Sequence, residues 1–154
     1  MDGDRESLQR GAVKMAYWLF KTEPETWSWD QQKARGAKGE PWSGVRNFQA
    51  ARNMKAMKKD DLGFFYHTGE EKRIVGIVEV IGEYRPDPTD ETQRFGLVNV
   101  KAVKDVPKPV TLADAKRDPK LKDMVLVKYS RLSVQPVTPE QWKHICKLGG
   151  VKDS

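Results

Sequence analysis

Residues 62–84 read LGFFYHTGEEKRIVGIVEVIGEY, and this stretch decides the fold. Its two halves, 62–67 and 73–84, are rich in Phe, Tyr, Ile and Val, which favour strands. The polar segment 68–71 between them contains Gly69, a residue typical of the turn between two paired strands. The stretch therefore predicts a β-hairpin.

Two further segments are expected to join the same sheet. Residues 17–21 are expected to form a short buried strand, which runs into residues 22–24 and is ended there by Pro24. Residues 95–106 alternate apolar and polar side chains, as in a half-buried strand. Pro107 and Pro109 are expected to close the later strand, because proline cannot donate to a ladder, and segment 85–90 is expected to stay unpaired for the same reason.

Helix signals lie between and after these strands. Ser28 with Gln31 and Thr138 with Gln141 form capping boxes, which predict helices over 29–35 and 139–148, and Thr111 opens a short one before residue 119. Strands that are first separated by helices and then follow one another indicate an α+β domain with a curved, barrel-like sheet.

A basic helix is expected after Asn47, its candidate N-cap. Its apolar face is expected to contain residues that recur every three positions: Phe48, Ala51, Met54 and Met57. Its exterior offers a surface for phosphates through Arg52, Lys55, Lys58 and Lys59.

Length and composition are consistent with one domain. The 154 residues are 38% apolar, and we expect a single domain over 15–150, a flexible N-terminal extension over 1–14 and a short tail over 151–154. No run of 18 apolar residues occurs, so no membrane span is expected. The net charge of +6 favours a phosphate-bearing partner, although solubilising lysines would give the same excess.

The inventory of catalytic and metal-binding residues is small. One cysteine, Cys146, and two histidines, His67 and His144, allow neither an internal disulfide nor a structural zinc site, which favours a reducing cytoplasm. No phosphate-binding loop or dinucleotide fingerprint is present, so no cofactor is expected. His144 and Cys146 would face different sides of a helix, and no carboxylate stands at a spacing that would orient His67 as a base.

The strongest candidate site is the run WSGVRN at residues 42–47. An indole, a glycine, a guanidinium and an amide within six residues are the groups that hold a planar polar ring. The alternative is that Trp42 and Val45 are core residues and Arg46 is an ion-pair partner. Trp18 and Trp142 are expected to anchor the core, whereas Trp27 and Trp29 either pack or support the site.

Five motifs in order resemble the EVE domain family: YWLFKTEP at 17–24, WSGVRNFQA at 42–50, FYHT at 65–68, IVGIVEV at 74–80 and SRLSVQPV at 130–137. The resemblance extends from about residue 16 to residue 148. It implies a PUA-like fold, a small curved β-barrel with surrounding short helices, and a pocket for a flipped, modified nucleobase.

The resemblance also implies which residues form this base pocket. Trp42 would be a wall, and the floor and polar edge would be Val45, Arg46 and Asn47. The flank would be Lys21 and Pro24, and the opposite side Tyr66, His67 and Thr68, where the threonine methyl narrows the space. Ser130 and Arg131 would close the pocket or meet the nucleic-acid backbone.

The sequence therefore predicts a monomeric module that binds DNA or RNA and reads a modified base. Two alternatives stay open. One is an enzyme acting on a nucleotide or modified base, with His67 and Thr68 near the reacting atom. The other is a protein-interaction module that keeps the pocket only as inherited structure.

Overall fold

The computed structural model describes residues 15–152. The segment expected to be a flexible extension, residues 1–14, lies outside the described residues, as do residues 153 and 154.

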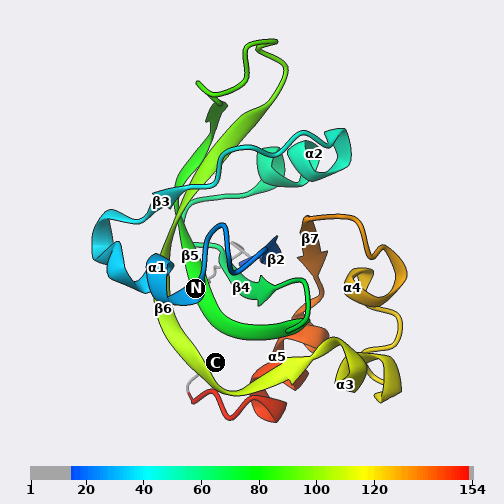
Figure 1. Ribbon diagram of the computed structural model, residues 1–154. Coiled ribbons are helices and arrows are strands. Elements are labelled where there is room, and N and C mark those ends of the chain that lie inside the picture. The colour runs from blue at the N-terminus through cyan, green and yellow to red at the C-terminus, as the bar shows by residue number, and fades with distance from the viewer. Residues whose placement is uncertain (1–14, 153–154) are drawn as a thin grey trace, which may run out of the picture.

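One six-stranded sheet, in the order β3-β6-β5-β4-β2-β7, forms the centre of the domain (Figure 1). The β4–β5 hairpin is confirmed, and β2 pairs in parallel with β4 while the other neighbours are antiparallel. The strands are β2 (Tyr17–Thr22), β3 (Glu40–Pro41), β4 (Leu62–His67), β5 (Arg73–Pro86), β6 (Gly96–Thr111) and β7 (Val134–Val137).

The α+β class is confirmed, but the expected barrel is not closed. Strands β3 and β7 are the two edges of the sheet, and no ladder joins them within residues 15–152. The sheet is curved instead along the long β5–β6 pair, whose register shifts at four points, and such irregularities bend and twist a ribbon.

Strand β6 continues past both prolines that were expected to end it. Pro107 and Pro109 lie where the pairing jumps from Gly76↔Asp105 to Ile74↔Val110, so neither has a partner in the ladder. Both are exposed, on a part of β6 that β3 does not reach. Strand β5 also extends to Pro86, which pairs with Gly96, so part of segment 85–90 belongs to the sheet.

The expected helix starts are confirmed. Ser28, Thr111 and Thr138 each form a complete capping box, and the side chain of Asn47 accepts from the backbone N–H of Ala50. The helices are α1 (Trp29–Ala34), the 3₁₀ helix η1 (Gly36–Lys38), α2 (Phe48–Ala56), α3 (Leu112–Arg117), α4 (Val125–Lys128) and α5 (Pro139–Leu148).

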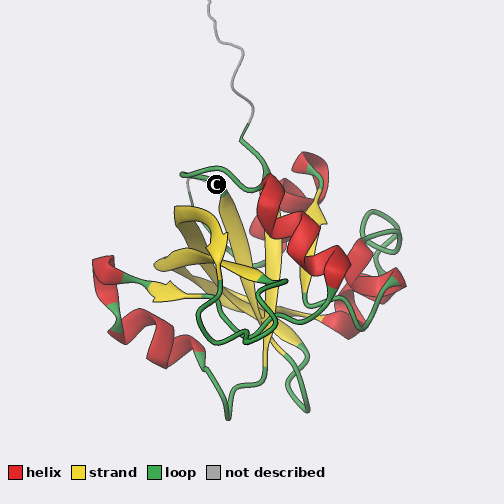
Figure 2. Ribbon diagram, turned by 90° about the horizontal axis from the view of Figure 1, so that it is seen from above, coloured by secondary structure: helices red, strands yellow, loops and turns green. Residues whose placement is uncertain are grey.

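A hydrophobic cluster lies on each face of the sheet, with helices on both sides of the strands (Figure 2). Trp142 of α5 lies in one cluster, where its ring stacks on Tyr17 and Phe64. Trp18 lies in the other cluster and donates from Nε1 to Asp61 over 3.0 Å. Both tryptophans are therefore core anchors, as expected.

The expected apolar face of helix α2 is confirmed at Ala51, Met54 and Met57, which are all buried, and is wrong at Phe48. Ala50, Ala51 and Met54 are buried, whereas Phe48 is 55% exposed and lies against the ring of Phe95. At 100° per residue, a strict three-residue spacing turns by about 60° at each step, so Phe48 leaves the buried face.

Candidate functional site

A hollow of about 390 Å³ opens between the end of β2, the segment before α1 and the loop after β3. Its volume lies within the range of pockets that hold small molecules. It is lined by Lys21, Thr22, Thr26, Trp27, Glu40, Pro41, Trp42, Ser43, Gly44, Val45, Arg46 and Ser133.

Trp42 lines this hollow and also packs in the hydrophobic core. Its indole is only 8% exposed and makes edge contacts with Phe20 and Phe65, at centroid distances of 5.2 and 5.7 Å. No residue in 15–152 accepts a hydrogen bond from its Nε1, and the one fully buried side-chain polar atom without a partner in that range is Oε1 of Gln135. The indole N–H of Trp42 is therefore open to solvent.

Trp27 supplies a second indole, and the two ambiguous tryptophans separate here. Trp27 is half-buried and lines the hollow, with its Nε1 donating to Gln32 over 2.8 Å. Trp29 is buried and donates to Asp105, and its ring packs so closely on Gly76 that a Cβ there would lie 2.2 Å from Cζ2. Trp29 is thus a core residue.

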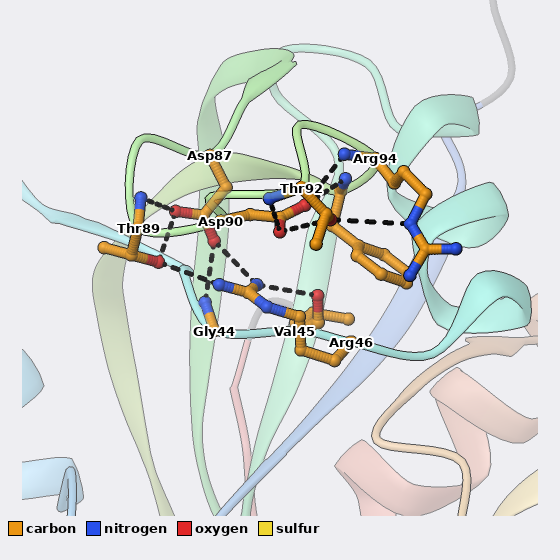
Figure 3. Close-up of polar contacts among 9 residues, drawn as sticks. Gly44, Val45, Arg46, Asp87, Thr89, Asp90, Thr92 and Arg94 are labelled. Atoms are coloured by element: carbon orange, nitrogen blue, oxygen red, sulfur yellow. Dashed lines mark hydrogen bonds and ion pairs between the residues drawn. The ribbon is translucent and has the colours of Figure 1, made fainter.

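The rim of the hollow is held by a buried carboxylate, that of Asp87 (Figure 3). Its Oδ2 accepts from the backbone N–H of Gly44 over 2.8 Å and from Nη1 of Arg46 over 3.2 Å, and its Oδ1 accepts from Thr89. Burial alone would raise the pKa of Asp87, but the hydrogen bonds from Thr89, Gly44 and Arg46 lower it to about 2. Gly44 has φ +82°, a conformation that favours glycine.

The loop that carries Asp87 is itself braced by a second aspartate. Asp90 accepts from the hydroxyl and N–H of Thr92 and from the backbone N–H groups of Arg94 and Phe95 (Figure 3). The Thr92 hydroxyl and these backbone donors lower the pKa of Asp90 to about 2. The loop is thus built to hold Asp87 against residues 44–46.

Lys21 connects the hollow to the segment after α4. Its Nζ donates to the carbonyl of Ser130 over 2.6 Å and lies 5.7 Å from the ring centre of Tyr66. Burial lowers the pKa of Lys21. Of the expected base-pocket residues, those that line this hollow are Lys21, Trp42, Val45 and Arg46.

Three of the other expected pocket residues line a second, adjoining hollow: Asn47, Ser130 and Arg131. Neither hollow is lined by Pro24, Tyr66, His67 or Thr68. The side chain of Tyr66 is buried in the cluster on the other face of the sheet, and both the N–H and the hydroxyl of Thr68 donate to the carbonyl of Thr22.

His67 has both ring nitrogens engaged, and one partner is Glu71, a carboxylate that the sequence analysis did not place beside it. Its Nε2 accepts from the backbone N–H of Trp29 over 3.0 Å, which leaves the proton on Nδ1 to be donated to Glu71 over 2.8 Å. The hydrogen bond from His67 lowers the pKa of Glu71. At 7% exposure, His67 fixes the start of α1.

Sequence reasoning assigned no role in the pocket to several lining residues: Thr22, Thr26, Glu40, Pro41, Ser43 and Ser133. Thr22 and Ser43 are the chain neighbours of the predicted residues Lys21 and Trp42, and this adjacency could have indicated that they line the hollow. Glu40, ion-paired with Arg35 over 3.2 Å, reaches the site only because β3 pairs with β6, and no local pattern indicates this pairing.

The four expected phosphate contacts are exposed on or after α2. Arg52 donates to Gln49 over 2.9 Å, and Nζ of Lys55 lies 5.5 Å from the ring centre of Tyr84.

Within residues 15–152, no group of three or more His, Cys, Asp or Glu is placed to hold a metal ion. In the same range, no helix has the length and apolar character needed to cross a membrane.

Residues 16–148 match the EVE domain as a family. The chain belongs to the EVE domain family. Its relatives include mouse thymocyte nuclear protein 1, which is 31% identical over 164 residues, covering 86% of this chain and 73% of the relative.

Solved structures of similar proteins agree with this EVE fold. A protein from Agrobacterium tumefaciens is 51% identical, with a TM-score of 0.88 over 90% of this chain and 96% of its own. Human thymocyte nuclear protein 1, crystallised in complex with DNA containing 5-methylcytosine, is 30% identical, with a TM-score of 0.80 over 87% and 97%. A YTH domain from Zygosaccharomyces rouxii, at 14% identity and a TM-score of 0.54 over 93% of this chain and 89% of its own, shares the fold alone, in line with a PUA-like architecture.

Proposed function

We propose that this EVE domain binds nucleic acid by receiving a modified base in the hollow at Trp42. The observation that carries the proposal is an open hollow of about 390 Å³ beside an indole whose N–H has no acceptor within residues 15–152. A hollow that leaves an indole N–H free is matched to a ligand with an acceptor, because a ligand that displaced the water without accepting from this N–H would leave it unpaired.

The other lining groups suit the edge of a base. Glu40 offers carboxylate oxygens, which accept from an exocyclic amino group such as that of cytosine, and the hydroxyls of Ser43 and Ser133 both donate and accept. Val45 supplies apolar surface for a methyl group, which gives about 1–3 kcal/mol of selectivity. The human relative's complex with DNA containing 5-methylcytosine supports that base as the first ligand to test.

Catalysis is the weaker candidate function. The enzyme alternative needs His67 free beside the ligand, whereas its ring nitrogens bond to Trp29 and Glu71 and it does not line the hollow. A binding role requires no further chemistry from the site.

A cytoplasmic location stays a prediction. The relatives are called nuclear proteins, which favours the nucleus. A single cysteine, which cannot form an internal disulfide, is consistent with either compartment.

The test is thermal unfolding of the protein with cytidine nucleosides that carry or lack a 5-methyl group. A ligand at 100 times its Kd adds about 2.7 kcal/mol, which raises the Tm of a domain of this size by about 5–10 °C. We expect this shift with 5-methyl-2′-deoxycytidine and a smaller one with 2′-deoxycytidine.

Trp42→Phe is the matched variant, because it keeps a ring in the core and removes only the N–H and part of the surface. We expect it to weaken nucleoside binding, whereas Trp142→Phe, on the opposite face of the sheet, changes the starting Tm but not the nucleoside-induced shift. Equal shifts for Trp42→Phe and the parent protein would contradict the proposal.

A further inference from the structure

A second hollow of about 350 Å³ adjoins the first. Its lining comes from the start of α2 and from the segment after α4: Asn47, Gln49, Tyr129, Ser130, Arg131 and Leu132. Unlike the hollow at Trp42, which contains Glu40, it is lined by no acidic side chain. A ligand with negative charge therefore meets no carboxylate there.

The two hollows share a rim on two segments of chain. Arg46 lines the first and Asn47 the second, while Ser133 lines the first and Leu132 the second. Consecutive Cα atoms are about 3.8 Å apart, so the two linings follow one another directly along the chain at both places. Lys21 also joins them, since it lines the first and donates to the carbonyl of Ser130 in the second.

Tyr129 is the unusual residue of the second hollow. Its side chain is 62% exposed, and within residues 15–152 it makes no hydrogen bond, ring contact or cation contact. Its backbone is nevertheless fixed, because its N–H donates to Val125 over 2.7 Å and its carbonyl accepts from the N–H of Leu132 over 3.1 Å. The buried Gln135 holds the same turn by donating to Leu132 over 2.7 Å.

An uncovered aromatic ring on a fixed backbone is a platform on which a base can stack. Two arginines accompany it. Arg131 is exposed and forms no ion pair within the described residues, and the guanidinium of Arg52 reaches the hollow's edge through its hydrogen bond to Gln49. Guanidinium groups beside an aromatic platform are suited to the phosphates that flank a stacked base.

We propose that this second hollow binds the nucleotide adjacent to the modified base on the same strand. The neighbouring base stacks on Tyr129, and the phosphate that joins the two nucleotides lies between Arg131 and Arg52. The inference rests on the proposed function, because the first base must occupy the hollow at Trp42 to deliver its neighbour here.

The experiment compares two probes on the intact protein: the nucleoside 5-methyl-2′-deoxycytidine and a single-stranded oligonucleotide with one 5-methylcytosine. Tyr129→Ala should weaken the oligonucleotide about 5- to 150-fold, the worth of one stacked base, and leave the nucleoside unchanged. Tyr129→Phe keeps the ring and should retain the parent's affinity. Leu148→Ala, another exposed apolar residue, is the control for surface substitution.

A third probe makes the assignment specific. An oligonucleotide with an abasic residue beside the 5-methylcytosine should bind the parent protein as weakly as the complete strand binds Tyr129→Ala, and the two changes together should add no further loss. Arg131→Gln should lower the slope of log affinity against log salt by about 0.7, as expected for one phosphate of a single strand.

The outcomes separate the two proposals. Selective binding of both probes with no effect of Tyr129→Ala overturns the second site and leaves the proposed function standing. Equal losses for the nucleoside and the oligonucleotide overturn it too, since Tyr129 would then belong to the first hollow. If neither probe binds, both proposals fail.

Discussion

Replacing Asp87 by Asn tests whether the carboxylate of the β5–β6 loop shapes the hollow at Trp42. The substitution keeps the size of the side chain but replaces one acceptor oxygen by an NH₂ group. If the remaining oxygen stays with Thr89, the new NH₂ faces the N–H of Gly44 and the guanidinium of Arg46. Two donors then lose their acceptor.

The size of the effect follows from these contacts. Leaving a buried donor without its acceptor costs about 1–3 kcal/mol, so we expect a loss of about 2 kcal/mol and a Tm lower by about 4–8 °C. Binding should weaken as well, because Arg46 then keeps only its hydrogen bonds to Val45 and Thr89 and is less ordered before the ligand binds. Immobilising one long side chain costs about 0.5–1.5 kcal/mol, which is about 2- to 10-fold in affinity.

The pH dependence gives a second measurement on the same variant. Because the folded protein holds the pKa of Asp87 at about 2, below the usual 3.8, the carboxylate stabilises the fold above about pH 4. That contribution is lost as the pH falls from about 4 through about 2. Asp87→Asn should therefore lose less stability over this interval than the parent protein.

Asp90→Asn is the matched control, because Asp90 braces the same loop but contacts neither Gly44 nor Arg46. We expect both variants to be less stable and Asp87→Asn to lose more nucleoside affinity than Asp90→Asn, as measured by thermal unfolding and calorimetry. Parent-like stability and affinity of Asp87→Asn would refute the reasoning, and so would equal losses of affinity in the two variants.

Three further predictions test the fold and the charged surface. Gly76→Ala places a Cβ about where the ring of Trp29 lies, so urea unfolding should show a loss of about 1–3 kcal/mol, and an unchanged midpoint would be inconsistent with this packing. His67→Ala should lose about 1–3 kcal/mol of stability without changing nucleoside affinity, and lost affinity at parent-like stability would revive a role in the site. Changing Lys55, Lys58 and Lys59, on and after α2, to Gln should lower the slope of log oligonucleotide affinity against log salt by up to about 2. An unchanged slope would mean that the strand does not contact these lysines.

Local signals predicted the elements of this domain well because they act within a few residues. The capping boxes at Ser28, Thr111 and Thr138 satisfy backbone donors three positions away, so their effect is visible in the sequence. The same holds for the hairpin of β4 and β5, whose strands are separated by one turn. The family motifs, in turn, predicted Trp42 as a lining residue.

What sequence could not predict depends on pairing between distant segments. Pro107 and Pro109 end a strand only if a neighbour needs their N–H groups, and here the β5–β6 register jumps past them. The two hollows were expected as one pocket, because Trp42 and Asn47 belong to the same motif. A sequence motif does not show that these two side chains line different hollows. Glu71 is four residues from His67, yet only the turn after β4 brings their side chains together.

The parallel pairing of β2 with β4 has a consequence for how this architecture diversifies. Parallel neighbours cannot be joined by a tight turn, so residues 23–61 form one long connection across the sheet. This connection supplies every lining residue of the first hollow except Lys21, Thr22 and Ser133. On the proposed function, we therefore expect an exchange of residues 40–47 between EVE domains to change ligand preference while the order of the strands stays the same.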